Sequence, residues 1–197
     1  MLASIAYLLD LLIHDRARAD ELQDLRKRLA AAPPPGRVSH QEALLALELR
    51  ELRGEILRAL GEVQVCRGCA RGHPLPHGRW DGGHCCGGRT AHLFTDDEVA
   101  SLRAGGTRAW HLRGPHSEHA GCSFRGPRGC SLRPADRPNL CVRYTCPELR
   151  EELRARGDLA QIDRMCDRLL VTFTRFTQAR ARRRDDEVFG ELLGGGH

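Results

Sequence analysis

Cysteine is the residue type in this chain whose number and spacing could do chemistry. Eight of the nine cysteines fall between residues 66 and 146. They form a C-x2-C pair, an adjacent pair and two wider pairs: Cys66 and Cys69, Cys85 and Cys86, Cys122 and Cys130, Cys141 and Cys146. A C-x2-C turn lets two thiolates converge on one cation, and glycines such as those of GGHCCGG let the backbone turn tightly. We therefore predict that these eight cysteines bind metal.

The cysteine pattern does not determine which metal is bound. Eight thiolates could hold two Zn²⁺ ions, one [4Fe–4S] cluster with four thiols spare, or one Zn²⁺ with the other thiols partly buried. A catalytic zinc normally keeps an open position and has His or carboxylate among its ligands, whereas an all-cysteine set is typical of a structural site. We predict one principal site, occupied by zinc or by an iron–sulfur cluster.

Disulfide bonds are the alternative use of so many cysteines, and they require an oxidising compartment. The N-terminal run MLASIAYLLDLLIHDR lacks a basic start, contains Asp10 and is not followed by a small-residue cleavage site, so it is not typical of a signal peptide. No run approaches the roughly 18 apolar residues that a membrane span needs. We expect a soluble, cytoplasmic protein with reduced thiols.

One ordered set of motifs covers residues 66–150. It consists of C-x2-C, then CC, then a helix start at TDDE, then GCSLRPADRPNLCVRYTC. This order resembles the bacterial CxxCxxCC family of zinc- or iron-chelating domains, whose members similarly end in Cys-Ser-Ile-Tyr, an Arg-Pro pair, a further Cys and an aromatic-x-Cys. The matching positions in this chain are Cys130, Arg137, Pro138, Cys141, Tyr144 and Cys146.

The resemblance implies metal chelation, and in one related domain, which accompanies a flagellin lysine N-methylase, an iron–sulfur cluster. The chain departs from the family pattern in the fifteen residues ARGHPLPHGRWDGGH between Cys69 and Cys85. This insertion brings in His73, His77 and His84, which we expect to be solvated loop residues more often than ligands.

The elements that would position the cysteines are predicted to be helices. Leucines at a 3-4 spacing predict one helix over residues 1–30 and another from the capping box at Ser39 and Glu42 to about residue 62, joined by APPPG as a helical hairpin. These two helices would pack on each other or on the rest of the chain, or form a coiled coil with a partner. A short helix should begin at Thr95, with Glu98 completing a second capping box.

Helix is expected to return after Cys146. Pro147 suits a first helical position, Gly157 and Asp158 predict a break, and a further helix has one apolar face formed by Ile162, Met165, Cys166, Leu169, Leu170, Phe173 and Phe176. Cys166 should be a buried core thiol, and the arginine-rich stretch 175–187 a solvated, self-paired helix end. The fold class is thus mainly α, with a helical hairpin (1–63), an irregular cysteine-rich domain (64–148) and C-terminal helices (149–197).

Three functions fit this pattern, and we favour a non-enzymatic metalloprotein whose helical arms bind a protein partner or a second copy. An iron–sulfur enzyme or a methyltransferase-associated module is the alternative. Against it, no nucleotide-binding glycine motif or metalloprotease motif is present, and His111, His116 and His119 are expected to lie in an exposed loop. A nucleic-acid-binding zinc module is the least favoured, because the net charge of +5 ignores thiolates and aromatic residues are few.

Overall fold

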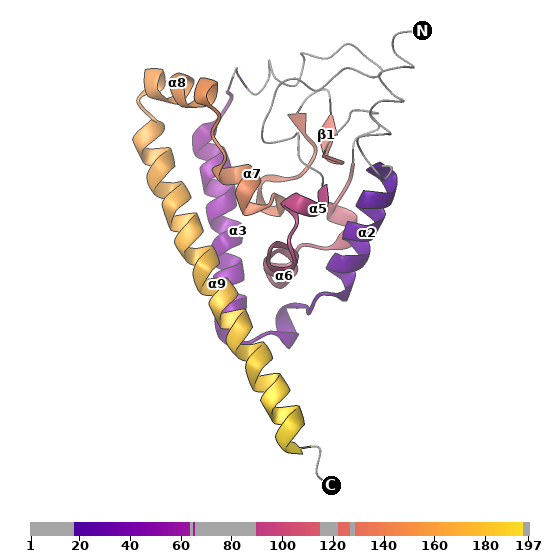
Figure 1. Ribbon diagram of the computed structural model, residues 1–197. Coiled ribbons are helices and arrows are strands. Elements are labelled where there is room, and N and C mark those ends of the chain that lie inside the picture. Colours follow the sequence, from indigo (N-terminus) through magenta and orange to yellow (C-terminus); the bar gives the residue numbers. More distant parts are fainter. Residues whose placement is uncertain (1–17, 64, 66–89, 115–121, 127–128, 195–197) are drawn as a thin grey trace.

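The computed structural model describes residues 18–63, 65, 90–114, 122–126 and 129–194, and these residues are mainly helical, as predicted (Figure 1). Helices α3 (His40–Leu60) and α9 (Leu159–Gly194) lie side by side, and α8 (Pro147–Arg156) precedes α9. Helix α2 (Arg18–Ala31) lies on the opposite side of the molecule (Figure 1). In the described residues no helix is both long and apolar enough to span a membrane.

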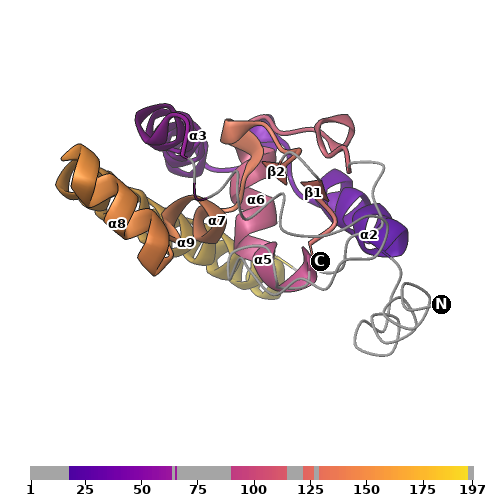
Figure 2. The same cartoon turned by 90° about the horizontal axis from the view of Figure 1, so that it is seen from above.

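Short elements fill the space between these helices. In chain order they are η1 (Pro35–Arg37), α5 (Thr90–Leu93), α6 (Asp96–Ala104), η2 (Ala109–His111), β1 (Arg125–Gly126), β2 (Gly129–Cys130), η3 (Pro134–Asp136) and α7 (Asn139–Arg143). Strands β1 and β2 pair antiparallel, with Arg125 opposite Cys130. Both views place α6 between α2 on one side and the α3–α9 pair on the other (Figures 1 and 2).

The local signals for helix ends act as predicted in several places. Ser39 and Glu42 form the capping box of α3, with the Glu42 N–H donating to Ser39 Oγ at 3.2 Å and the Ser39 N–H to Glu42 Oε2 at 3.0 Å. Pro147 begins α8, and Gly157 ends it in the left-handed region at φ +82°, which a glycine adopts without strain. At Thr95 only half of the predicted capping box forms, because the Glu98 carboxylate accepts hydrogen bonds from α3 and α7 instead.

The two helices of the predicted hairpin are present from residue 18 onward, and each buries its leucines against a different part of the chain. Helix α3 packs antiparallel on α9, because Glu42 at the start of α3 contacts Arg183, whereas Glu48, further along α3, pairs with Arg168, which comes earlier in α9. We call the cluster between them the α3–α9 core. Its buried members are Leu45, Ala46, Leu49, Leu52, Ile56, Leu60, Ala100, Ala104, Val142, Leu149, Leu153, Ile162, Cys166, Leu169, Phe176 and Ala179. Cys166 is thus a buried core thiol, as predicted, whereas Leu170 is 40% exposed and does not belong to the apolar face.

A second cluster, the α2–α6 core, lies on the other side of α6. Its buried members are Leu25, Leu29, Leu93, Phe94, Val99, Leu102, Leu112, Cys122, Phe124 and Leu132. Phe94 and Phe124 are its largest side chains, with ring centroids 5.5 Å apart. Helix α6 therefore contributes to both cores, with Ala100 and Ala104 facing one and Val99 and Leu102 the other.

The arginine-rich part of α9 does more than pair with itself. Arg183 Nε donates to Glu42 Oε2 at 2.7 Å, and Arg180 pairs with Asp97 of α6. Glu42 is fully buried, and although burial alone would raise its pKa, hydrogen bonds from Arg183 and Ser39 outweigh this and lower the pKa. The prediction of a self-paired helix end is confirmed for Arg183, which also pairs with Glu187 at 2.6 Å, but Arg180 and Arg183 are not simply solvated, because they join α9 to α6 and α3.

Three consecutive carboxylates in the first turn of α6 each pair with an arginine from a different helix. Asp96 receives Arg28 Nη2 of α2 at 2.7 Å, Asp97 receives Arg180 of α9, and Glu98 receives Arg53 Nη2 of α3 at 3.4 Å. Carboxylates are also favoured at this end of a helix by its dipole. These pairs connect the two cores through α6.

Candidate metal centre

The four predicted ligands from Cys122 to Cys146 do not all pack against the same core. Cys122 is 7% exposed in the α2–α6 core, and Cys130 and Cys141 pack against the same core. Cys146 instead packs against the α3–α9 core, where its Sγ caps α8 by accepting the Leu149 N–H at 3.4 Å. Cys122, Cys130 and Cys141 therefore share one core, whereas Cys146 stands at the start of α8 against the other.

The other four predicted ligands lie outside the described residues: Cys66, Cys69, Cys85 and Cys86. The same holds for His73, His77, His84, His116 and His119. Among the residues that the structure describes, no group of three or more His, Cys, Asp or Glu side chains is placed to hold a metal ion. The three cysteines near the α2–α6 core thus do not form a metal site by themselves.

A short hairpin positions Cys122 and Cys130. Strands β1 and β2 pair between them, and the Ser131 N–H donates to Phe124 O at 2.8 Å just beyond the pair. Phe124, which is fully buried, fixes the hairpin to the core. The glycines of FRGPRGC suit such a tight connection, although the sequence alone did not reveal the strand pair.

A buried carboxylate holds the segment between Cys130 and Cys141. Asp136 in η3 is fully buried and accepts hydrogen bonds from Thr107 Oγ1 and Arg133 Nε, both at 2.7 Å. Arg137 Nε donates to Leu132 O at 3.3 Å within the same turn. The R-P-A-D-R-P stretch is therefore a self-bonded turn whose carboxylate points inward. Arg133 and Arg137 are thus both bonded within this turn.

A second buried network holds α7, which carries Cys141. Arg53 is fully buried, and its Nε donates to Asn139 Oδ1 at 2.9 Å while its Nη2 donates to Ser101 Oγ at 2.9 Å and to Glu98 Oε2 at 3.4 Å. Glu98 Oε1 in turn accepts the Asn139 backbone N–H at 2.9 Å. Glu98 thus connects the start of α6 with the start of α7, and Arg53 ties both to α3.

The ionisation of this network follows from its burial. Burial raises the pKa of Glu98 to about 7, although Arg53 and the hydrogen bonds from Asn139 act in the opposite direction. Burial likewise lowers the pKa of Arg53, which remains a cation because an arginine side chain does not lose its proton in proteins.

Stability is expected to fall as the pH rises from about 5 to 7. Glu98 has an ordinary pKa of 4.5, so between 4.5 and about 7 the folded state binds more protons than the unfolded state, and raising the pH through this window favours unfolding. This shift in the Glu98 pKa corresponds to at most about 3 kcal/mol of the free energy of unfolding.

Urea unfolding of the wild type and of Glu98→Gln at several pH values would measure this pH dependence. The variant should lose the part of the slope of stability against pH that Glu98 contributes. Asp167→Asn, on the exposed face of α9, should keep the wild-type slope; an unchanged slope in Glu98→Gln would contradict the assignment.

Two of the described thiols, Cys146 and Cys166, lack the lowered pKa of an activated nucleophile. Burial raises the pKa of both thiols, so both are protonated at neutral pH in the absence of a metal. Arg143, whose Nε is buried without a hydrogen-bond partner in the described part of the chain, lowers the Cys166 pKa only in part.

His111 is the one histidine of the AWHLRGPHSEH stretch that the structure describes. Its Nδ1 accepts the Arg108 N–H at 3.2 Å. Burial and the charge of Arg133 lower its pKa, so the ring is neutral and Nδ1 acts as the acceptor rather than pairing with Asp136 at 3.8 Å. His111 thus closes the η2 turn, and its side chain is only 17% exposed, so the prediction that it lies in an exposed loop is wrong.

No family model, curated protein or solved structure matches this chain significantly. The resemblance to the CxxCxxCC family therefore depends on the quoted residues, and neither the family nor the metal follows from similarity to a known protein.

Proposed function

We propose that this protein binds zinc or an iron–sulfur cluster through cysteines of the 66–146 segment and acts as a structural, sensing or adaptor component. The proposed ligands come from the set Cys66, Cys69, Cys85, Cys86, Cys122, Cys130, Cys141 and Cys146. One observation carries the proposal. The residues that flank the 66–89 segment are hydrogen-bonded to the two regions where the C-terminal cysteines lie.

The first of these hydrogen-bonded residues is Thr90, which is buried at the start of α5. Its hydroxyl donates to Ser123 Oγ at 2.9 Å and accepts the Ser123 N–H at 3.0 Å. Ser123 directly follows Cys122, and Cys86 stands four residues before Thr90. The short sequence separation between Cys86 and Thr90, whose side chain is bonded to the neighbour of Cys122, supports a shared site.

The second is Val65, whose N–H donates to Glu152 Oε2 of α8 at 3.0 Å. Val65 and Cys146 both pack against the α3–α9 core. Cys66 directly follows Val65 in the sequence. The residue that precedes Cys66 is therefore bonded to α8, the helix that Cys146 caps. Both residues that flank the 66–89 segment are thus hydrogen-bonded to parts of the chain that carry predicted ligands, which supports the proposal.

The donor set suits a site that stabilises the fold. A small α2–α6 core and a long stretch rich in glycine and cysteine would gain stability from a bound metal, as other small cysteine-rich domains do. Four thiolates complete either a tetrahedral zinc site or a [4Fe–4S] cluster. An iron–sulfur enzyme or an accessory module for a methyltransferase is the alternative, and it would require substrate turnover in addition to the metal.

Assembly through the helical arms is part of the same proposal. The leucine stripes of α2 and α3 are buried inside the chain, so a partner helix would have to use other residues. Leu44 and Leu47, which are 54% and 49% exposed on α3, are the residues that such a partner would cover.

Anaerobic purification followed by elemental analysis and a visible absorption spectrum tests the proposal. We expect stoichiometric zinc in a colourless protein or iron and sulfide with broad visible absorption. Removing the metal should reduce circular dichroism only in part, because α3, α8 and α9 share a core of their own. Substoichiometric metal in protein that is folded and reduced would overturn the proposal, and turnover of a substrate by the purified protein would favour the enzyme alternative.

A further inference from the structure

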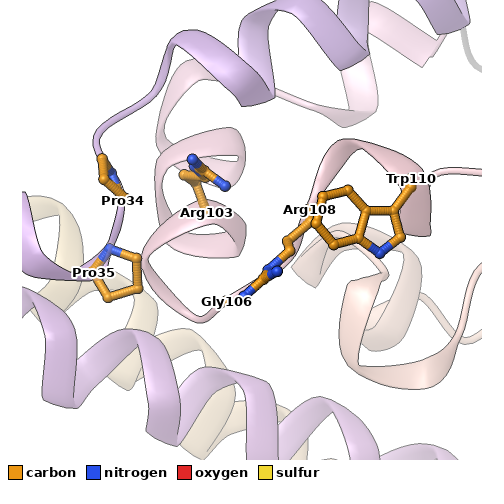
Figure 3. Close-up of a pocket in the computed structure, with 6 residues that line it drawn as sticks. All are labelled: Pro34, Pro35, Arg103, Gly106, Arg108 and Trp110. Atoms are coloured by element: carbon orange, nitrogen blue, oxygen red, sulfur yellow. The ribbon is translucent and has the colours of Figure 1, made fainter.

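A pocket lies away from the described cysteines, beside the turn that follows α6. Its volume is about 340 Å³, and it is lined by Pro34, Pro35, Arg103, Gly106, Arg108 and Trp110. Figure 3 shows the proline pair on one side and Trp110 on the other, with the two arginines between them. The volume lies within the range of small-ligand pockets.

The pocket carries positive charge that no described carboxylate neutralises. Arg103 Nε donates only to the backbone oxygen of Ala32, at a long 3.4 Å. The Arg108 guanidinium lies over the Trp110 ring, 4.9 Å from its centroid. Asp136 is the carboxylate packed behind this turn, and it is fully buried and already bound by Arg133 and Thr107. Two arginines are thus left facing the pocket without an acidic partner in the described part of the chain.

The rings of Pro34, Pro35 and Trp110 form the apolar part of the pocket lining. Trp110 is 58% exposed, which is unusual for so large an aromatic side chain. Gly106 has φ +89°, and Arg50 Nη1 lies 3.4 Å from the place where its Cβ would be, so a larger residue there would be strained and would crowd Arg50. Arg50 itself is held by a 2.7 Å bond to Gly105 O. The backbone conformation of this turn therefore favours glycine at position 106.

We propose that this pocket binds a small planar anion, that is, an aromatic or heteroaromatic ring carrying a phosphate or carboxylate group. The ring packs against Trp110 and the proline pair, and the anionic group lies between Arg103 and Arg108. Arginine suits this role because its fork of N–H donors binds phosphate and carboxylate oxygens in pairs. The site is independent of the metal proposal, since it contains none of the cysteines.

Tryptophan fluorescence tests the proposal directly. The chain has two tryptophans, so Trp80→Phe leaves Trp110 as the reporter. We expect saturable fluorescence changes with adenosine monophosphate or with benzoate, which distinguish the phosphate from the carboxylate source. Adenosine, which lacks the anion, and inorganic phosphate, which lacks the ring, should bind at least about tenfold more weakly.

Two arginine variants and a matched control complete the experiment. Arg103→Gln and Arg108→Gln should each weaken binding of the ring-bearing anion about tenfold or more. Both side chains are partly or fully exposed, so circular dichroism should show an unchanged fold. Arg175→Gln, an exposed arginine on α9, should leave binding unchanged. The proposal is wrong if neither anion gives a saturable response, if adenosine or inorganic phosphate binds equally well, or if neither pocket variant weakens binding.

Discussion

Replacing Cys141 with serine is expected to lower metal affinity by more than about a hundredfold, because loss of a thiolate ligand should exceed the 10- to 100-fold effect typical of supporting residues. Cys141 packs against the α2–α6 core beside Cys122 and Cys130, on a helix that the Arg53 and Glu98 network holds in place. Because metal binding and folding are coupled in such domains, protease resistance of the 66–146 segment should fall as well. Elemental analysis of protein purified without oxygen measures the first effect.

Cys166→Ala is the matched control for this variant. Cys166 is also a cysteine with little exposure, but it lies in the α3–α9 core, and its predicted role is packing. Its replacement should cost about 1 kcal/mol of stability or less and leave the metal content unchanged. Full metal content in Cys141→Ser, or a loss of metal in Cys166→Ala, would contradict the ligand assignment.

Arg53→Met is expected to destabilise the protein by about 3–5 kcal/mol, which is the usual cost of removing one partner of a buried ion pair. The Arg53 side chain is fully buried, and its loss would leave Glu98, Ser101 and Asn139 without their hydrogen-bond donor. Methionine keeps much of the side-chain volume, so the measured loss would come from the missing charge and hydrogen bonds more than from a cavity. Urea unfolding followed by circular dichroism measures the change.

Two further variants separate the charge effect from a general effect on α3. Arg58→Gln changes an exposed arginine on the same helix and should alter stability by less than about 0.5 kcal/mol. The double variant Arg53→Met, Glu98→Gln should be more stable than Arg53→Met alone, because it leaves no buried carboxylate without its cation. A loss below about 1 kcal/mol in Arg53→Met would show that the network contributes little.

The helices could be predicted because their signals are local. Leucine spacing, the Ser39 capping box, Pro147 and Gly157 each act within a few residues, and each has its expected effect. What each helix packs against is not local. Arg53 stands among leucines and resembles any surface arginine in the sequence, yet its partners Glu98 and Asn139 are 45 and 86 residues away.

The candidate site was predictable only as a set of residue types. The cysteine pattern identified Cys122, Cys130 and Cys141, which share one core, but it could not place Cys146 on the other side of α7. The motif GCSLRPADRPNLCVRYTC contains the buried Asp136 and Asn139, but it does not indicate what they do. Their role depends on Thr107 and Arg53, which come from distant segments that no local pattern connects to them.

The three arginine pairs of α6 also determine its rotational setting. Successive residues of a helix point about 100° apart, so Asp96, Asp97 and Glu98 face three different directions and meet arginines from α2, α9 and α3. Turning α6 by one residue would break all three pairs at once. Toward the α3–α9 core the packing side chains of α6 are the small Ala100 and Ala104, whereas Val99 and Leu102 fill the α2–α6 core. The ion pairs therefore add to the packing of Val99 and Leu102 in selecting one rotation of α6, and they matter most on the side where its side chains are small.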